Sequence, residues 1–140
     1  MNSHGLLGIH HIAVICSDYE RSKQFYVETM GFAVVAETYR PDRRSYKLDL
    51  ALPDGTQIEL FSFPTPPARP SRPEAVGLRH LAFRVSELDR AVRSLASKGI
   101  SCEPVRTDEH TGKRFTFFAD PDALPLELYE SPGEPGLPTG

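Results

Sequence analysis

Two histidines and two glutamates recur at matching positions in the two halves of this 140-residue sequence. His11 begins the segment His-Ile-Ala-Val, and His80, 69 residues further on, begins His-Leu-Ala-Phe. Glu59 and Glu127 each precede a leucine and an aromatic residue and lie 68 residues apart. Imidazole nitrogens suit Zn, Ni, Co or Fe, and carboxylate oxygens suit these ions and Mn. The four residues therefore predict a divalent-metal site to which each half contributes one His and one Glu.

Each of these residues also has a simpler structural interpretation. A single histidine on an apolar strand is more often a hydrogen-bonded core residue than a ligand, and a single glutamate can be a solvated strand residue. Burying two carboxylates in a cleft flanked by Phe61 and Tyr129 would be costly unless a cation compensated them. The duplication therefore favours a metal site, and four protein ligands in octahedral geometry would leave two positions for water or substrate.

The first half of the chain contains the elements that must position His11 and Glu59. Strand patterns occupy residues 9–16, 32–39, 46–52 and 56–63. A helical pattern over 19–30 ends at Gly31, where a left-handed residue closes a helix. Pro53-Asp54-Gly55 is a turn signal between the last two strands. Residues 8–63 are therefore expected to form a βαβββ module.

The second half, residues 77–130, repeats this order. A helix is expected over 87–98, and strands over 78–85, 101–106, 114–119 and 126–129. Five prolines in residues 64–73 indicate a linker, and residues 131–140 are expected to be a flexible tail. The sequence thus predicts a single α+β domain over 8–130, in which two βαβββ modules form a curved mixed sheet around a metal cleft.

Alternation along a strand decides which histidines can be ligands. His11 shares a face with Ile15, whereas His10 points to the opposite face and is left out of the ligand set. His4 and His110 fall in expected loops, where a solvated surface position is typical. If a pseudo-twofold axis relates the modules, the two His and two Glu positions converge on that axis.

Composition and charge exclude several classes of partner. The net charge is −3, and no basic run could neutralise a row of phosphates, which argues against nucleic acid. No apolar run approaches the roughly 20 residues of a membrane helix, and the N-terminus lacks the features of a secretion signal. Cys16 and Cys102 are too few for a disulfide framework. We therefore expect a cytoplasmic protein with a small-molecule substrate and with neither nucleic acid nor membrane as a partner.

Several segments resemble the vicinal oxygen chelate superfamily, which includes glyoxalase I, extradiol dioxygenases, methylmalonyl-CoA epimerase and thiol-transferring antibiotic-resistance proteins. They are HHIAVICSD, SKQFYVETMGF, QIELFSF, LRHLAFRV and DPDALPLELYE. The resemblance covers nearly all of residues 8–130 and is strongest to small bacterial glyoxalase-like proteins. It implies a homodimer and a divalent ion, with Zn or Ni preferred over Co, Mn or Fe. The implied metal ligands are His11, Glu59, His80 and Glu127.

The resemblance also implies a reaction. In glyoxalase I the metal polarises the oxygens of a hemithioacetal while a ligand carboxylate moves a proton between adjacent carbons through an enediolate. Glu127 corresponds to that base, and Glu59 is the second candidate. A Glu at the second ligand position is similar to glyoxalase I, whereas dioxygenases usually lack a ligand there and the epimerase has Gln. The expected function is a lactoylglutathione lyase-like lyase or isomerase acting on a small oxygenated substrate.

Two positions depart from glyoxalase I and argue against glutathione. Ile15 stands where glyoxalase I carries an Arg, and Phe63 stands where it carries an Asn, and both of those residues hold glutathione. Arg84 lies four residues after His80 on the same strand face and is a candidate for binding a substrate carboxylate. Tyr129 and Phe63 are further candidates for substrate contact.

Two other functions stay open at the level of sequence. One is Fe-dependent, extradiol-type dioxygenation by two His and one Glu, which a fourth ligand at Glu59 disfavours because oxygen chemistry needs open coordination positions. The other is non-catalytic drug or metabolite binding, as in resistance proteins of the superfamily. Most such binders lack the metal ligands, so the presence of all four candidates argues against it.

Overall fold

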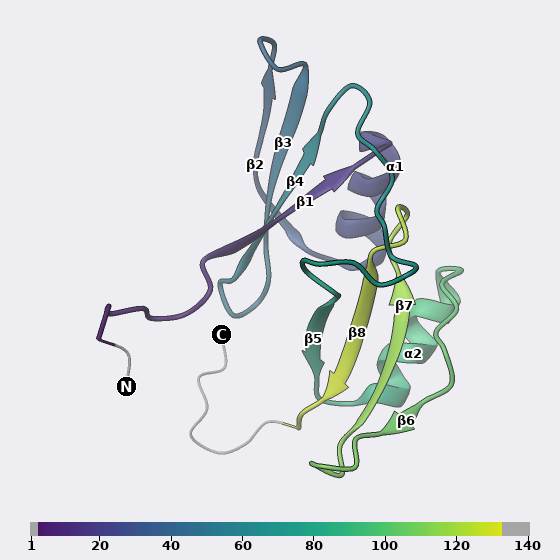
Figure 1. The fold of residues 1–140 in the computed structure, drawn as a ribbon. Helices are drawn as coiled ribbons and strands as arrows, with labels where there is room; N and C mark the ends of the chain where they lie inside the picture. The colour runs from purple at the N-terminus through teal and green to yellow at the C-terminus, as the bar shows by residue number, and fades with distance from the viewer. Residues whose placement is uncertain (1–2, 133–140) are drawn as a thin grey trace. The chain divides into compact units, whose positions relative to one another are not determined.

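The computed structural model describes residues 3–132, which form two compact units divided between Pro66 and Pro67. The boundary lies inside the proline-rich segment that was expected to link the modules. Each unit contains one four-stranded sheet with helical structure on one face (Figure 1). The α+β fold of two βαβββ modules is thereby confirmed. The tail predicted from residue 131 lies, beyond residue 132, outside the described residues.

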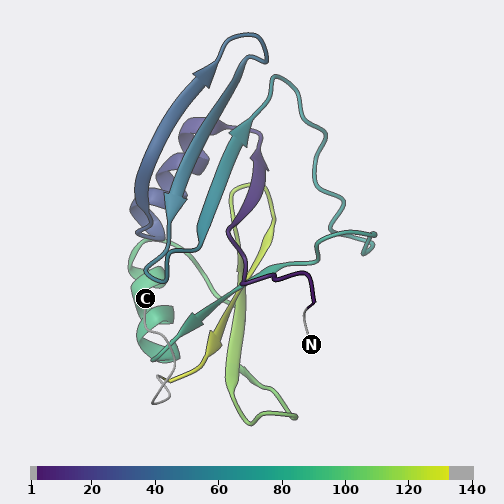
Figure 2. The ribbon, with the colours of Figure 1, turned by 90° about the vertical axis from the view of Figure 1, so that its left-hand side faces the viewer.

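The first unit has the strand order β1-β4-β3-β2. Its elements are β1 (His11–Cys16), α1 (Tyr19–Gln24), β2 (Ala33–Arg40), β3 (Ser45–Ala51) and β4 (Gln57–Ser62). Strand β1 is parallel to β4, and the other pairs are antiparallel. Asp18 caps α1 by accepting a hydrogen bond from the backbone N–H of Arg21 at 3.2 Å. Figure 2 shows β1 beside β4 on one edge of this sheet.

The second unit repeats this topology with the order β5-β8-β7-β6. Its elements are β5 (Leu81–Val85), α2 (Leu88–Ser97), β6 (Arg106–Thr107), β7 (Arg114–Ala119) and β8 (Pro125–Glu130). Strand β5 is parallel to β8, as β1 is to β4. The first and last strands of each module are therefore hydrogen-bonded neighbours in both units.

The strand expected over residues 101–106 is wrong in its extent, because regular pairing begins only at Arg106. Pro104 lacks an N–H and cannot donate to a strand ladder. The segment is attached to β7 at single points instead. The N–H of Glu103 donates to the carbonyl of Phe117 at 2.8 Å, and the buried hydroxyl of Thr116 donates to the carbonyl of Glu103 at 2.6 Å.

Alternation along the strands gives each sheet an apolar face covered by helical structure. In the first unit that face is formed by Val14, Cys16, Leu48, Leu50, Ile58 and Leu60, all buried. In the second unit the corresponding residues are Phe118, Leu126 and Leu128, and α2 contributes Leu88 and Leu95. Since successive side chains point to opposite faces, the polar residues between them lie on the face away from the helix.

The helix expected over 19–30 is regular only in its first half. Helix α1 ends at Gln24 and continues as a π-helical turn, Phe25–Thr29, in which the N–H of Met30 donates to the carbonyl of Phe25 at 2.9 Å. The wider turn buries both Phe25 and Tyr26. Gly31 then ends the helix at φ +78°, as the sequence predicted. Within residues 3–132, no helix is long and apolar enough to cross a membrane.

The turns before β4 and β8 are equivalent, but only one uses glycine. Gly55 has φ +89°, and Ala123, 68 residues later, has φ +65°. The left-handed region costs a non-glycine residue about 1–2 kcal/mol. The second module therefore carries strain at Ala123 that the first module avoids.

We expect Ala123→Gly to stabilise the protein, because relief of the left-handed strain outweighs glycine's extra freedom in the unfolded chain. The net gain should be about 0.5–1 kcal/mol. The converse change, Gly55→Ala, should cost about 1 kcal/mol, since a Cβ there meets nothing within 4 Å and only the backbone conformation opposes it. Thermal and urea unfolding of both variants checks this, and an unchanged Tm in Ala123→Gly would contradict it.

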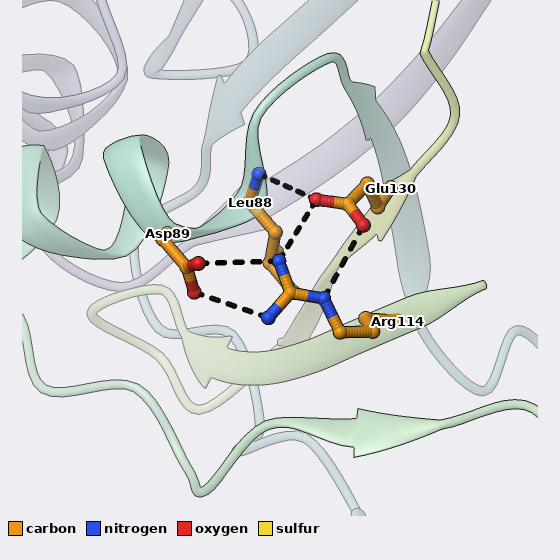
Figure 3. A network of polar contacts seen from close by, with 4 residues as sticks. All are labelled: Leu88, Asp89, Arg114 and Glu130. Atoms are coloured by element: carbon orange, nitrogen blue, oxygen red, sulfur yellow. Dashed lines mark hydrogen bonds and ion pairs between the residues drawn. The ribbon is translucent and has the colours of Figure 1, made fainter.

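An ion-pair network fastens α2 to the ends of β7 and β8 (Figure 3). The guanidinium of Arg114 donates to Asp89 at 3.2 and 3.3 Å and to Glu130 at 3.1 and 3.3 Å. Glu130 also accepts a hydrogen bond from the backbone N–H of Leu88, in the first turn of α2, at 3.1 Å. Arg114 first, and then this N–H, hold the pKa of Glu130 below its ordinary value of 4.5.

Glu130→Gln should therefore lower the Tm at pH 7 and have less effect in acid. Because the folded-state pKa of Glu130 is depressed, its contribution is fully present above pH 4.5 and is lost as pH falls through the folded value. The gap in Tm between wild type and variant should close toward pH 3. Glu87→Gln is the matched control, since the side chain of Glu87 forms an exposed pair with Arg90. A gap independent of pH would count against this role of the ionised carboxylate.

Candidate metal centre

In the first unit, His11 and Glu59 meet on the face of the sheet away from the helix. His11 begins β1 and Glu59 lies in β4, and the parallel register pairs Ala13 with Glu59. Their side chains approach to 3.6 Å between Nε2 and Oε1. The Glu59 side chain is only 14% exposed, so its carboxylate lies largely out of solvent.

His80 and Glu127 form the equivalent pair in the second unit. His80 immediately precedes β5, and Ala82 is paired with Glu127, as Ala13 is with Glu59. The Nε2–Oε1 distance is 3.0 Å, and the Glu127 side chain is 11% exposed. The sequence repeat is therefore also a repeat in side-chain geometry, with one His–Glu pair in each unit.

The chemistry of these pairs fits a divalent cation. An imidazole nitrogen and a carboxylate oxygen facing each other at 3.0–3.6 Å are a common donor combination for transition metals. Within residues 3–132, neither unit gathers three or more His, Cys, Asp or Glu side chains that could hold a metal ion. Each unit by itself thus supplies two donors.

His10 contacts His11, although sequence reasoning left it out of the site. The Nδ1 atoms of the two rings lie 2.9 Å apart, and the rings meet edge to face. One ring therefore donates to the other through Nδ1. This contact occupies Nδ1 of His11 and leaves Nε2 directed to Glu59. Metal-binding histidines are oriented in the same way by a hydrogen-bonding partner on the ring nitrogen that does not bind the metal.

Around Glu59 the structure adds two charged residues that sequence reasoning did not assign to the site. Asp49 is directly opposite Glu59 in the β3–β4 pair. Lys47 Nζ lies 3.0 Å from Asp49 and 3.8 Å from Glu59, and the hydrogen bond to Asp49 raises the pKa of the Lys47 amine. The predicted turn centres the hairpin on Asp54, and this register pairs residue 49 with residue 59. The position of Asp49 opposite Glu59 could therefore have been found from the sequence.

Around Glu127 the corresponding positions are aromatic. Phe117 is directly opposite Glu127 in the β7–β8 pair, and Phe115 is opposite Tyr129. The ring of His80 meets Phe117 edge to face, with centroids 5.1 Å apart. A hollow of about 720 Å³ in this unit is lined by His80, Glu127 and both phenylalanines, among other residues. The His–Glu pair of the second unit therefore borders a space large enough for a small molecule.

The predicted substrate contacts are distributed over both units. Arg84 is exposed on β5 and is paired in register with Tyr129, on the same face as Glu127. The ring of Tyr129 stacks on Phe115. In the first unit, Phe63 stacks on Phe61, with its ring 5.3 Å from the Arg43 guanidinium. The roles of Arg84, Tyr129 and Phe63 in substrate contact stay predictions.

Residues 8–128 match the family described as the Glyoxalase/Bleomycin resistance protein/Dioxygenase superfamily. The chain belongs to this superfamily. The resemblance found in the sequence is thus confirmed, as is the two-module fold that it implied.

Several known proteins are similar to this chain over most of its length. The uncharacterized protein YwkD of Bacillus subtilis (strain 168) is 68% identical over 89% of this chain and 98% of its own length. The crystal structure of the glyoxalase family protein from Enterococcus faecalis is 50% identical, with a TM-score of 0.83 over 88% of this chain and 97% of that chain. A 2-epi-5-epi-valiolone epimerase of Actinomyces sp is 28% identical over 91% of this chain and 81% of its own length.

The hydroxyl of Tyr129 is held by the loop between β6 and β7, which gives a test of the geometry near Glu127. It contacts the hydroxyl of Thr111 and donates to Asp108 at 2.8 Å. The backbone N–H of His110 first, and then Tyr129, lower the pKa of Asp108 from its ordinary 3.8.

We expect Tyr129→Phe to raise the pKa of Asp108 part of the way toward 3.8, because one of its donors is lost while the His110 N–H is kept. The pKa is measured by NMR titration of the carboxyl carbon. Tyr39→Phe, an exposed tyrosine of the first unit, is the control and should leave it unchanged. An identical Asp108 titration in Tyr129→Phe would show that this contact does not form in solution.

Proposed function

We propose that this chain is a metal-dependent enzyme with glyoxalase I-like lyase or isomerase chemistry on a small oxygenated substrate. The observation that supports this proposal is the His–Glu pair formed at equivalent positions in each unit. In this proposal one divalent ion, Zn or Ni by preference, is bound by both pairs, within one chain or across a homodimer. The ligands are His11, Glu59, His80 and Glu127.

The bound ion would act as a Lewis acid that polarises the substrate's oxygen atoms. Glu127 is the preferred general base, because its carboxylate borders the hollow of the second unit in which a substrate has room to lie. It removes a proton from a carbon beside the polarised oxygen and returns a proton to the neighbouring carbon, so the atoms of the substrate are conserved. Glu59, which shares Lys47 with Asp49, is the second candidate for this role.

The family context supports an isomerase class. The relative from Actinomyces is named as an epimerase, and removal and return of a proton at one carbon is a general route to inverting it. Glutathione is disfavoured as cosubstrate by Ile15 and Phe63, which offer no polar anchor at the two positions discussed above. The proposed substrate class is accordingly a small molecule with adjacent oxygen functions.

Metal analysis tests the ligand set directly. Purified protein loaded with Zn or Ni should hold about one ion for every two His–Glu pairs, which is one ion per chain. His80→Ala should lose stoichiometric binding because it removes one nitrogen donor. His110→Ala is the matched control, because His110 lies in an exposed loop. Equal metal content in wild type and His80→Ala, measured by elemental analysis, would reject the ligand assignment.

Activity assays on the same samples separate the reaction classes. Glu127→Gln should lower turnover roughly 10²- to 10⁴-fold if Glu127 is the general base. Methylglyoxal with glutathione is the first substrate pair, and metal binding without turnover would exclude this pair while keeping the metal site. Oxygen uptake by the iron-loaded protein with a catechol would instead indicate the dioxygenase alternative.

A further inference from the structure

The two units share a backbone plan but differ in what surrounds the His–Glu pair. At positions 68 residues apart, Lys47 of the first unit corresponds to Phe115, and Asp49 corresponds to Phe117. The first unit thus places charged side chains beside its glutamate, and the second places two aromatic rings there. The hollow of about 720 Å³ lies entirely among residues of the second unit.

Four arginines line this hollow, and they differ in the contacts that they make with other residues. Arg79 is ion-paired with Glu74 at 2.8 Å. Arg69 donates to the backbone carbonyls of Leu78 at 2.6 Å and Arg79 at 3.0 Å. Arg72 is exposed in the segment before β5, and the fourth arginine, Arg106, lies over the aromatic floor of the hollow.

Arg106 is the cation best placed to meet a ligand. Its guanidinium carbon is 5.3 Å from the ring centroid of Phe115 and 5.4 Å from that of Phe117. A guanidinium that lies over aromatic rings, which accept no conventional hydrogen bond, keeps its N–H groups available for a two-point contact with a carboxylate or phosphate. Its ion pair with Glu103 is 3.3 Å long, with both side chains more than half exposed, and such pairs are weak.

We propose that this hollow binds a substrate with an anionic group, a carboxylate or a phosphoryl group, joined to a small apolar body. Arg106 binds the anion in place of Glu103, and Phe115 and Phe117 contact the apolar body. The far end of the substrate then reaches His80 and Glu127, which rests on the function proposed above. The anion site itself requires no metal.

Binding of phenylphosphonate, benzoate and neutral benzamide to the full chain tests this proposal. The protein is first freed of metal by chelation and dialysis, so that an anion cannot bind through an ion. Dissociation constants are obtained from NMR shifts of the Phe115 and Phe117 backbone amides. Arg106→Gln should weaken binding of at least one anion about tenfold or more and leave benzamide unchanged. Glu103→Gln should tighten binding of that anion, because it removes the competing carboxylate.

Arg90→Gln is the matched control, since Arg90 of α2 and Glu87, which caps that helix, form the same kind of exposed pair, three residues apart. A response of phenylphosphonate alone identifies a phosphoryl group, and a response of benzoate alone identifies a carboxylate. Equal anion binding in wild type and Arg106→Gln, or an equal loss for benzamide, would overturn the proposal. If Arg106 binds the anion but His80→Ala holds as much metal as wild type, the proposed function is rejected and this inference stands. If His80→Ala loses the metal but Arg106→Gln binds the anion as wild type does, this inference is rejected and the proposed function stands.

Discussion

The parallel pairing of the first and last strands of each module is the constraint on which the candidate site depends. It places Ala13 beside Glu59 and Ala82 beside Glu127, so that the histidine two residues earlier reaches the carboxylate. A slip of one residue would turn the glutamate toward the apolar face that the helix covers. The buried leucines of the central strands, together with Ile58, fix this register, and the packing of the core thus determines the geometry of the polar face.

Much of this arrangement could be predicted from the sequence because it rests on local rules. The repeat gave the order of elements and the equivalence of the two His and two Glu positions, alternation selected His11 rather than His10, and the Pro53-Asp54-Gly55 turn gave the β3–β4 hairpin. The extent of the strand before residue 106 was missed, because the repeat of the first module predicted a strand there, whereas Pro104 cannot donate to a strand ladder and the segment is held to β7 by single contacts. The π-helical turn after Gln24 was missed because it depends on burying Phe25 and Tyr26 together, which is a tertiary effect.

The surroundings of the glutamates were predicted less well than the glutamates themselves. Asp49 and Phe117 lie on neighbouring strands, so their relevance depends on cross-strand register rather than on nearby sequence. Arg106 is harder still to find from sequence, because its guanidinium lies over the rings of two residues of β7, Phe115 and Phe117. Residues that are repeated in both modules reveal a site from the sequence alone. Residues that differ between the modules bear on the selectivity of the site, and their correspondence is recognised only when the structure aligns the two modules.

The brevity of β6 has an evolutionary consequence. Only two residues of this edge strand pair with β7, and the chain around them is a hairpin loop on one side and an irregular segment on the other. Such connections tolerate insertion, deletion and substitution far better than central strands do. New ligand preferences could therefore arise in descendants of this chain by remodelling one peripheral hairpin, while the strands that carry histidine and glutamate are inherited unaltered.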